Sequence, residues 1–180
     1  MSPVTRMWLA FAAICTGLIH AALAATAPLP LMALLAALGL AELAWGLLTF
    51  IRDRIAAPVA VLAGALTPLA AWGLLVLGAA AGGARELLDA LPLVPMAIAG
   101  AFQLFVALTV GRRVRNGARE AIQDSAKPIA AGRYVAALFA GALASAALVT
   151  PALAATDAGD GALPHGHGIV PAEVSEHPQH

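Results

Sequence analysis

The chain has 180 residues, of which 61% are hydrophobic and 11% charged, and its formal net charge is zero. Soluble domains carry about 25% charged residues, so this composition, with a mean hydropathy of +0.87, indicates an integral membrane protein. The zero net charge argues against a nucleic-acid partner, because phosphate binding needs a basic surface. A single cysteine, Cys15, excludes an intramolecular disulfide and any CxxC site for a metal or redox reaction.

Five apolar runs divide the chain, and each is about as long as a helix that crosses a hydrocarbon core of roughly 30 Å. We therefore predict an all-α, polytopic transmembrane helical bundle within residues 1–155, with five helices at residues 7–25, 31–51, 55–80, 92–110 and 134–152. A polar loop is expected at 111–132. The links before the second and third helices are short, which predicts that the first and second helices, and the second and third, are antiparallel neighbours.

The basic residues predict an orientation. If the five runs cross the membrane in alternating directions, nine of the ten Lys and Arg residues lie on one side of the membrane and only Arg85 lies on the other. Short loops rich in Lys and Arg remain in the cytoplasm. This places the N-terminus in the cytoplasm and the C-terminal tail on the exoplasmic side of the cell membrane.

Two segments resemble the small-residue sites that signal peptidase reads, one ending at Ala24 and one at Ala154. The first apolar run is long for a signal peptide, and such spacings are common in an alanine-rich chain. We therefore expect both helices to be retained, with cleavage after Ala24 or Ala154 as the alternative.

Glu42 is the only acidic residue deep inside an apolar run, where an ionised carboxylate must be paired, protonated or exposed to a wet cavity. Counting about 1.5 Å per residue from the outer helix ends places Glu42 and Gln103 about 16 Å deep, with Thr67 at a similar level. His20 lies about 8 Å deep on the same count, which predicts no direct contact with Glu42. These four residues predict a proton- or cation-coupled site. The alternative is a set of interhelical hydrogen bonds that only stabilise the bundle, at about 0.6–2 kcal/mol each.

The tail, residues 156–180, lacks apolar periodicity and is predicted to be disordered. It contains four of the five histidines: His165, His167, His177 and His180. Imidazole with nearby carboxylates suits Cu(II) or Zn(II), but no spacing resembles a closed four-ligand zinc site. The tail therefore predicts a weak, exchangeable metal site. A merely hydrophilic tail and a pH-responsive tail are the alternatives.

Motifs for nucleotide binding, metalloprotease chemistry and serine hydrolysis are missing from the sequence, so no enzyme activity is expected. One predicted function is a small membrane protein that binds or handles copper or zinc at the outer face through its tail. The other is a structural or accessory subunit of a larger membrane complex. The expected partners are the lipid bilayer and either another membrane protein or a second copy of the chain.

Overall fold

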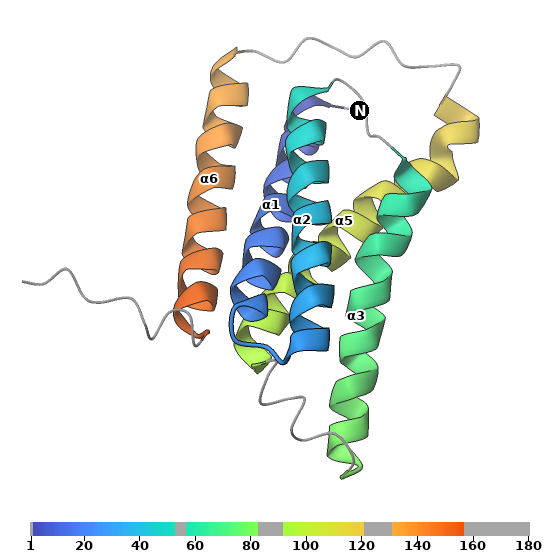
Figure 1. Cartoon of the computed structure of the whole chain (residues 1–180). Helices are drawn as coiled ribbons and strands as arrows, with labels where there is room; N and C mark the ends of the chain where they lie inside the picture. The colour runs from blue at the N-terminus through green and yellow to red at the C-terminus, as the bar shows by residue number, and fades with distance from the viewer. Residues whose placement is uncertain (1, 53–56, 83–91, 121–130, 157–180) are drawn as a thin grey trace, which may run out of the picture.

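The computed structural model describes residues 2–52, 57–82, 92–120 and 131–156. Over these residues the chain is all-α, with five helices: α1 (Pro3–Ala24), α2 (Leu29–Ile51), α3 (Pro58–Ala80), α5 (Leu93–Glu120) and α6 (Ala131–Ala154) (Figure 1). Each helix is long and apolar enough to cross a membrane. The predicted all-α chain with five helices of membrane-spanning length and apolarity is confirmed for the described residues, which suggests a multi-pass membrane protein.

The helix ends differ from the predicted ends by a few residues, except at the end of α5, where the difference is larger. The first helix begins before residue 7, because the backbone N–H of Thr5 donates to Ser2 Oγ (3.1 Å) and Pro3 occupies the first turn. The third begins at Pro58 rather than at residue 55, since a proline in the first turn needs no backbone donor. The largest correction concerns the predicted loop at 111–132, because α5 continues to Glu120. Arginine is a good helix former, so the end of the apolar run did not end the helix.

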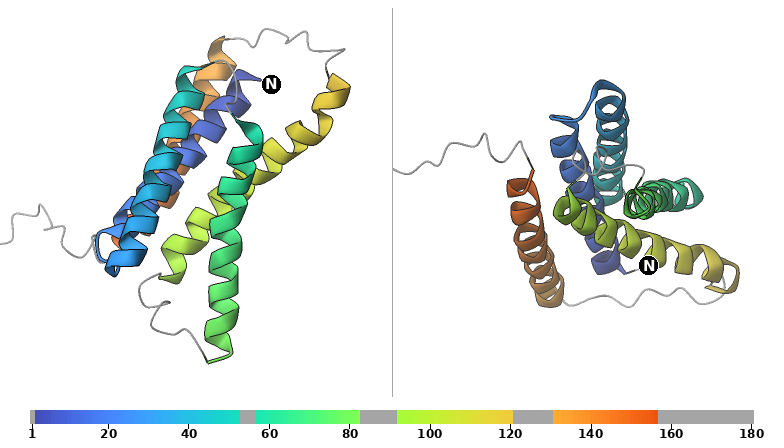
Figure 2. Two further views of the ribbon diagram at one scale, coloured as in Figure 1. Left: turned by 45° about the vertical axis from the view of Figure 1, so that its right-hand side comes forward. Right: turned by 90° about the horizontal axis from the view of Figure 1, so that it is seen from below.

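The central helix of the bundle is α1. It packs against α2, α5 and α6, and 67% of its most apolar stretch is buried inside the protein. In α3 only 6% of the most apolar stretch is buried inside the protein, and this helix packs mainly against α5 (Figure 2). The predicted pairing of the first two helices is confirmed. The predicted pairing of the second and third helices is wrong: a short link leaves the crossing angle between two helices free, and α3 diverges from α2 (Figure 2, left).

Glycines bring α1 and α2 into backbone contact. A Cβ atom added to Gly39 would lie 2.8 Å from the carbonyl oxygen of Gly17, and one added to Gly46 would lie 3.0 Å from the carbonyl oxygen of Ala10. Gly17 and Gly39 each precede a polar residue, His20 and Glu42, by about one helical turn. The close backbone approach therefore sets the distance between these two polar side chains.

The helices alternate in direction. The beginnings of α1 and α6 and the ends of α2 and α5 lie at the end of the bundle that carries the N-terminus (Figure 1). Arg6, Arg52, Arg112 and Arg133 belong to these helix ends. The alternating path assumed from the basic residues is therefore the path that the helices take.

Candidate intramembrane polar site

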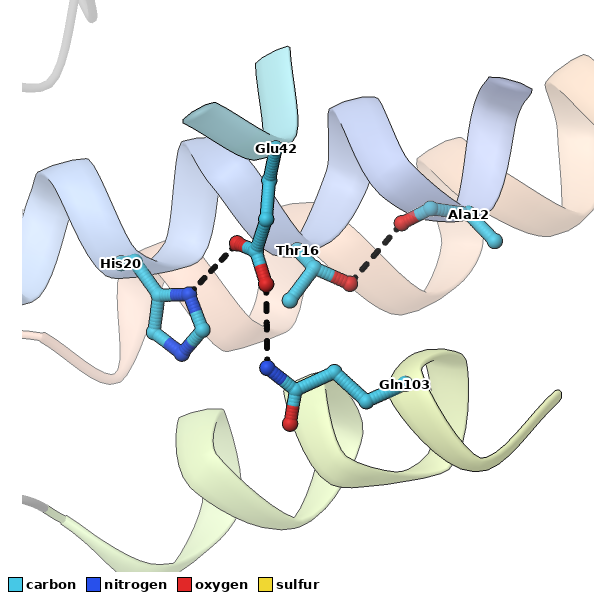
Figure 3. Close-up of polar contacts among 5 residues, drawn as sticks. All are labelled: Ala12, Thr16, His20, Glu42 and Gln103. Carbon is cyan, nitrogen blue, oxygen red and sulfur yellow. Dashed lines mark hydrogen bonds and ion pairs between the residues drawn. The ribbon is translucent and has the colours of Figure 1, made fainter. Parts of the chain in front are cut away.

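Three of the four predicted intramembrane residues meet at one place, each from a different helix (Figure 3). His20 Nδ1 of α1 lies 2.6 Å from Glu42 Oε2 of α2. Gln103 of α5 donates through Nε2 to the other carboxylate oxygen, Glu42 Oε1, at 3.0 Å. Both oxygens of the carboxylate therefore have a partner, and Gln103 holds the carboxylate in a fixed orientation.

The direct contact of His20 with Glu42 corrects the prediction that His20 lies too shallow to reach it. In an α-helix the Cα–Cβ bonds tilt toward the N-terminus. Because α1 and α2 are antiparallel neighbours, the side chains of His20 and Glu42 lean toward each other along the bundle. A depth count of Cα positions omits this lean and therefore overestimated their separation.

Thr67 does not belong to this group. It lies at an exposed position of α3, the helix that diverges from α2. Equal depth along a helix says nothing about the direction in which a side chain points around it. The hydroxyl beside the site is instead that of Thr16, whose Oγ1 donates to the carbonyl oxygen of Ala12 at 2.8 Å (Figure 3).

The three polar side chains differ in their access to the surroundings. The His20 side chain is 1% exposed and that of Glu42 is 14% exposed, while Gln103 is buried. Within the described part of the chain, His20 Nε2 is buried without a hydrogen-bond partner. A neutral imidazole that donates Nδ1–H to the carboxylate leaves an unpaired acceptor at Nε2, whereas an imidazolium leaves an unpaired N–H donor. In either form, His20 Nδ1 and Glu42 Oε2 lie within hydrogen-bond distance of each other, at 2.6 Å.

Glu42 borders a cavity of about 250 Å³ that lies between α2 and α3, with α1 and α5 behind it. Four residues of α2 line it, namely Leu38, Ala41, Glu42 and Trp45. From the α3 side it is lined by Ala57, Ala60, Val61, Gly64 and Ala65, and from α1 and α5 by Ala13, Thr16, Gln103 and Val106. Apart from Thr16, Glu42, Gln103 and the indole N–H of Trp45, the lining side chains are apolar.

Sequence reasoning missed this cavity and the place of Trp45 in it. The cavity exists because α3 turns away from α2, which a linear sequence does not reveal. The signal for Trp45 was available, since it follows Glu42 at the i,i+3 spacing that puts two residues on one helix face.

The predicted metal site of the tail stays a prediction, because its residues lie outside the described part of the chain: His165, His167, His177 and His180. Within residues 2–52, 57–82, 92–120 and 131–156, no group of three or more His, Cys, Asp and Glu side chains is placed to hold a metal ion. His20 and Glu42 offer only two ligands.

Comparison with protein-family models, with curated proteins and with solved structures finds no match. A functional conclusion for this chain therefore depends on the chemistry of its own site. That site combines a histidine–carboxylate pair inside a membrane-sized bundle with a cavity that reaches the carboxylate.

Proposed function

We propose that this multi-pass protein binds and releases a proton at the His20–Glu42 pair, within the hydrocarbon region of the cell membrane. The observation that carries the proposal is the 2.6 Å contact between the two ionisable side chains in the interior of the bundle. Gln103 orients the carboxylate, and Glu42 also borders the cavity, which makes it the less enclosed member of the pair.

The energetics favour this proposal over a purely structural role. An interhelical hydrogen bond between neutral side chains stabilises a membrane protein by about 0.6 kcal/mol on average, and a glutamine or threonine at position 42 would supply one. Burying a carboxylate and an imidazole costs far more free energy than burying neutral polar groups. Ionisable residues in membrane helices therefore occur mainly at functional sites. The Glu42 side chain is moreover 14% exposed, whereas a hydrogen bond with a purely structural role would be strongest if it were fully buried.

The direct test follows the protonation of His20 by nitrogen NMR on the full-length protein in nanodiscs. Replacement of the four tail histidines by Asn makes His20 the only histidine of the chain. We expect the His20 ring to change protonation state with pH, and Glu42→Gln to displace that change. Thr67→Val is the matched control, because it removes an exposed polar group from the same bundle and should leave the His20 spectrum unaltered.

Two results contradict the proposal. One is a His20 ring that keeps a single form over the whole pH range in which the protein stays folded. The other is a His20 titration that is identical in the wild type and in Glu42→Gln, since the two groups would then not share a proton.

We further propose that the N-terminus is cytoplasmic and the tail exoplasmic, which the position of nine of the ten Lys and Arg residues supports. In a Cys15→Ala background, Thr26→Cys reports on the link between α1 and α2, and Ser2→Cys reports on the opposite end of α1. A membrane-impermeant maleimide should label Thr26→Cys in intact cells and Ser2→Cys only after permeabilisation. The reverse pattern would require the opposite orientation.

A second candidate function is supported by the composition of the tail. Its four histidines and the nearby acidic residues suit capture of Cu(II) or Zn(II) at the outer face. The competing proposal, an accessory subunit of a larger complex, needs neither the metal nor a shared proton. It predicts that Glu42→Gln and replacement of the tail histidines leave assembly with the partner unchanged.

A further inference from the structure

We propose that the cavity between α2 and α3 binds a small apolar molecule with a single positive charge, such as an aromatic or alkyl ammonium ion. The inference rests on the proposed proton site, because it assigns to Glu42 a second occupant that competes with the proton. The cavity encloses about 250 Å³ and contains one carboxylate on an otherwise mainly apolar wall.

Charge complementarity selects a cation. Glu42 is the single ionisable residue of α2, and α3 contains none. The basic residues of α5 begin at Arg112, more than two helical turns beyond Gln103, and those of α1 and α6 lie in the first turns of these helices. The other titratable group of α1 in this region, the Cys15 thiol, does not line the cavity. The remaining titratable group at Glu42 is therefore His20.

The shape and lining of the cavity select an apolar body. Ala41, Ala60 and Gly64 have little or no side chain, which leaves room for a ligand beside the carboxylate. Trp45 lies on the same helix face as Glu42 and adds apolar surface to the cavity wall. An anion would be repelled by Glu42, and a neutral molecule would cover the carboxylate without compensating the lost hydration.

Binding of the cation changes the protonation of the pair in a defined way. When His20 is an imidazolium and Glu42 a carboxylate, the pair is neutral and holds one exchangeable proton. The incoming cation takes the place of that positive charge, and the imidazolium loses its Nε2 proton to water. His20 remains as a neutral imidazole that donates Nδ1–H to Glu42 Oε2, while the carboxylate now also faces the cation. One proton is exchanged for each cation, and no electron transfer is involved.

The test uses the full-length protein in nanodiscs and two probes of the same shape. Benzyltrimethylammonium carries the charge, and neopentylbenzene has carbon in place of the charged nitrogen. Isothermal titration in two buffers of different ionisation enthalpy gives both the affinity and the number of protons released. We expect Glu42→Gln to weaken binding of the ammonium probe by about tenfold or more, which is about 1.4 kcal/mol, and to leave the neutral probe unaffected.

A second pair of variants addresses the cavity without changing the polar site. A Cβ atom at Gly64 or at Gly73 meets nothing within 4 Å, so both positions of α3 accept a side chain. Gly64 lines the cavity, and Gly73 lies half a rotation away around the helix. Gly64→Leu should therefore abolish binding of the ammonium probe, and Gly73→Leu should not.

The cation site is overturned if the neutral probe binds as tightly as the ammonium probe, or if neither Glu42→Gln nor Gly64→Leu weakens binding. The outcomes also separate this inference from the proposed function. A His20 ring that titrates in a protein that does not bind the ammonium probe refutes the cation site alone. Binding that depends on Glu42 but releases no proton, with a His20 ring that keeps one form, refutes the proton site alone.

Discussion

Gly39→Ala should separate α1 from α2 and weaken the polar site, although it adds a single methyl group. The new Cβ atom would lie 2.8 Å from the carbonyl oxygen of Gly17 and 3.2 Å from the amide nitrogen of Ala21. Both are backbone atoms, so no side-chain rotation relieves the contact. Ordinary contact begins at 3.4 Å, so the two helices must part by about 0.6 Å. Overpacking of this kind costs about 1–3 kcal/mol.

The same displacement reaches the polar site, because Gly39 precedes Glu42 by about one turn. A separation of about 0.6 Å would lengthen the His20–Glu42 contact from 2.6 Å to about 3.2 Å. This exceeds the range of about 2.7–2.9 Å that is typical of charge-assisted hydrogen bonds. We therefore expect two simultaneous effects, a lower free energy of unfolding and a His20 nitrogen spectrum that indicates a weaker hydrogen bond.

The measurement is reversible unfolding of the full-length protein in mixed lipid–detergent bicelles, combined with the His20 spectrum. Gly73→Ala is the matched control, since its Cβ atom meets nothing within 4 Å and its cost should stay within about 0.5 kcal/mol. A Gly39→Ala protein as stable as Gly73→Ala, with an unchanged His20 spectrum, would refute the argument that backbone contact at the glycines positions the site.

Three further predictions concern the site and the tail. Glu42→Ala removes the acceptor of both His20 and Gln103 and should lower the free energy of unfolding by about 1–3 kcal/mol, whereas Glu42→Gln, which keeps an acceptor, should cost less in the same bicelle assay. The full-length protein should bind Cu(II) or Zn(II) more tightly than about 1 mM by titration, and replacement of His165, His167, His177 and His180 by Asn should remove that binding; millimolar or weaker binding by the wild type argues against a metal function. The mass of the purified protein should match the complete chain of 18.1 kDa, and a mass that corresponds to residues 1–154 would demonstrate cleavage after Ala154.

For the described residues, the sequence by itself determined the number, the approximate positions and the alternating direction of the helices. These properties depend on local composition, since a bilayer requires about 20 apolar residues per helix whatever the helix packs against. It also identified Glu42 and Gln103 as unusual, because polar residues are conspicuous in an apolar run. Its main local error was the end of α5, where the run of arginines marks the edge of the apolar region while the helix continues to Glu120.

The tertiary structure alone decided which helices meet and what their polar residues touch. The helices are rich in alanine and leucine on all sides, so no apolar stripe in the sequence specifies that α3 packs against α5 rather than α2. Depth along the helix axis was predictable, but the direction around the axis and the lean of the side chains were not. These two properties bring His20 to Glu42, turn Thr67 outward and open the cavity beside the carboxylate.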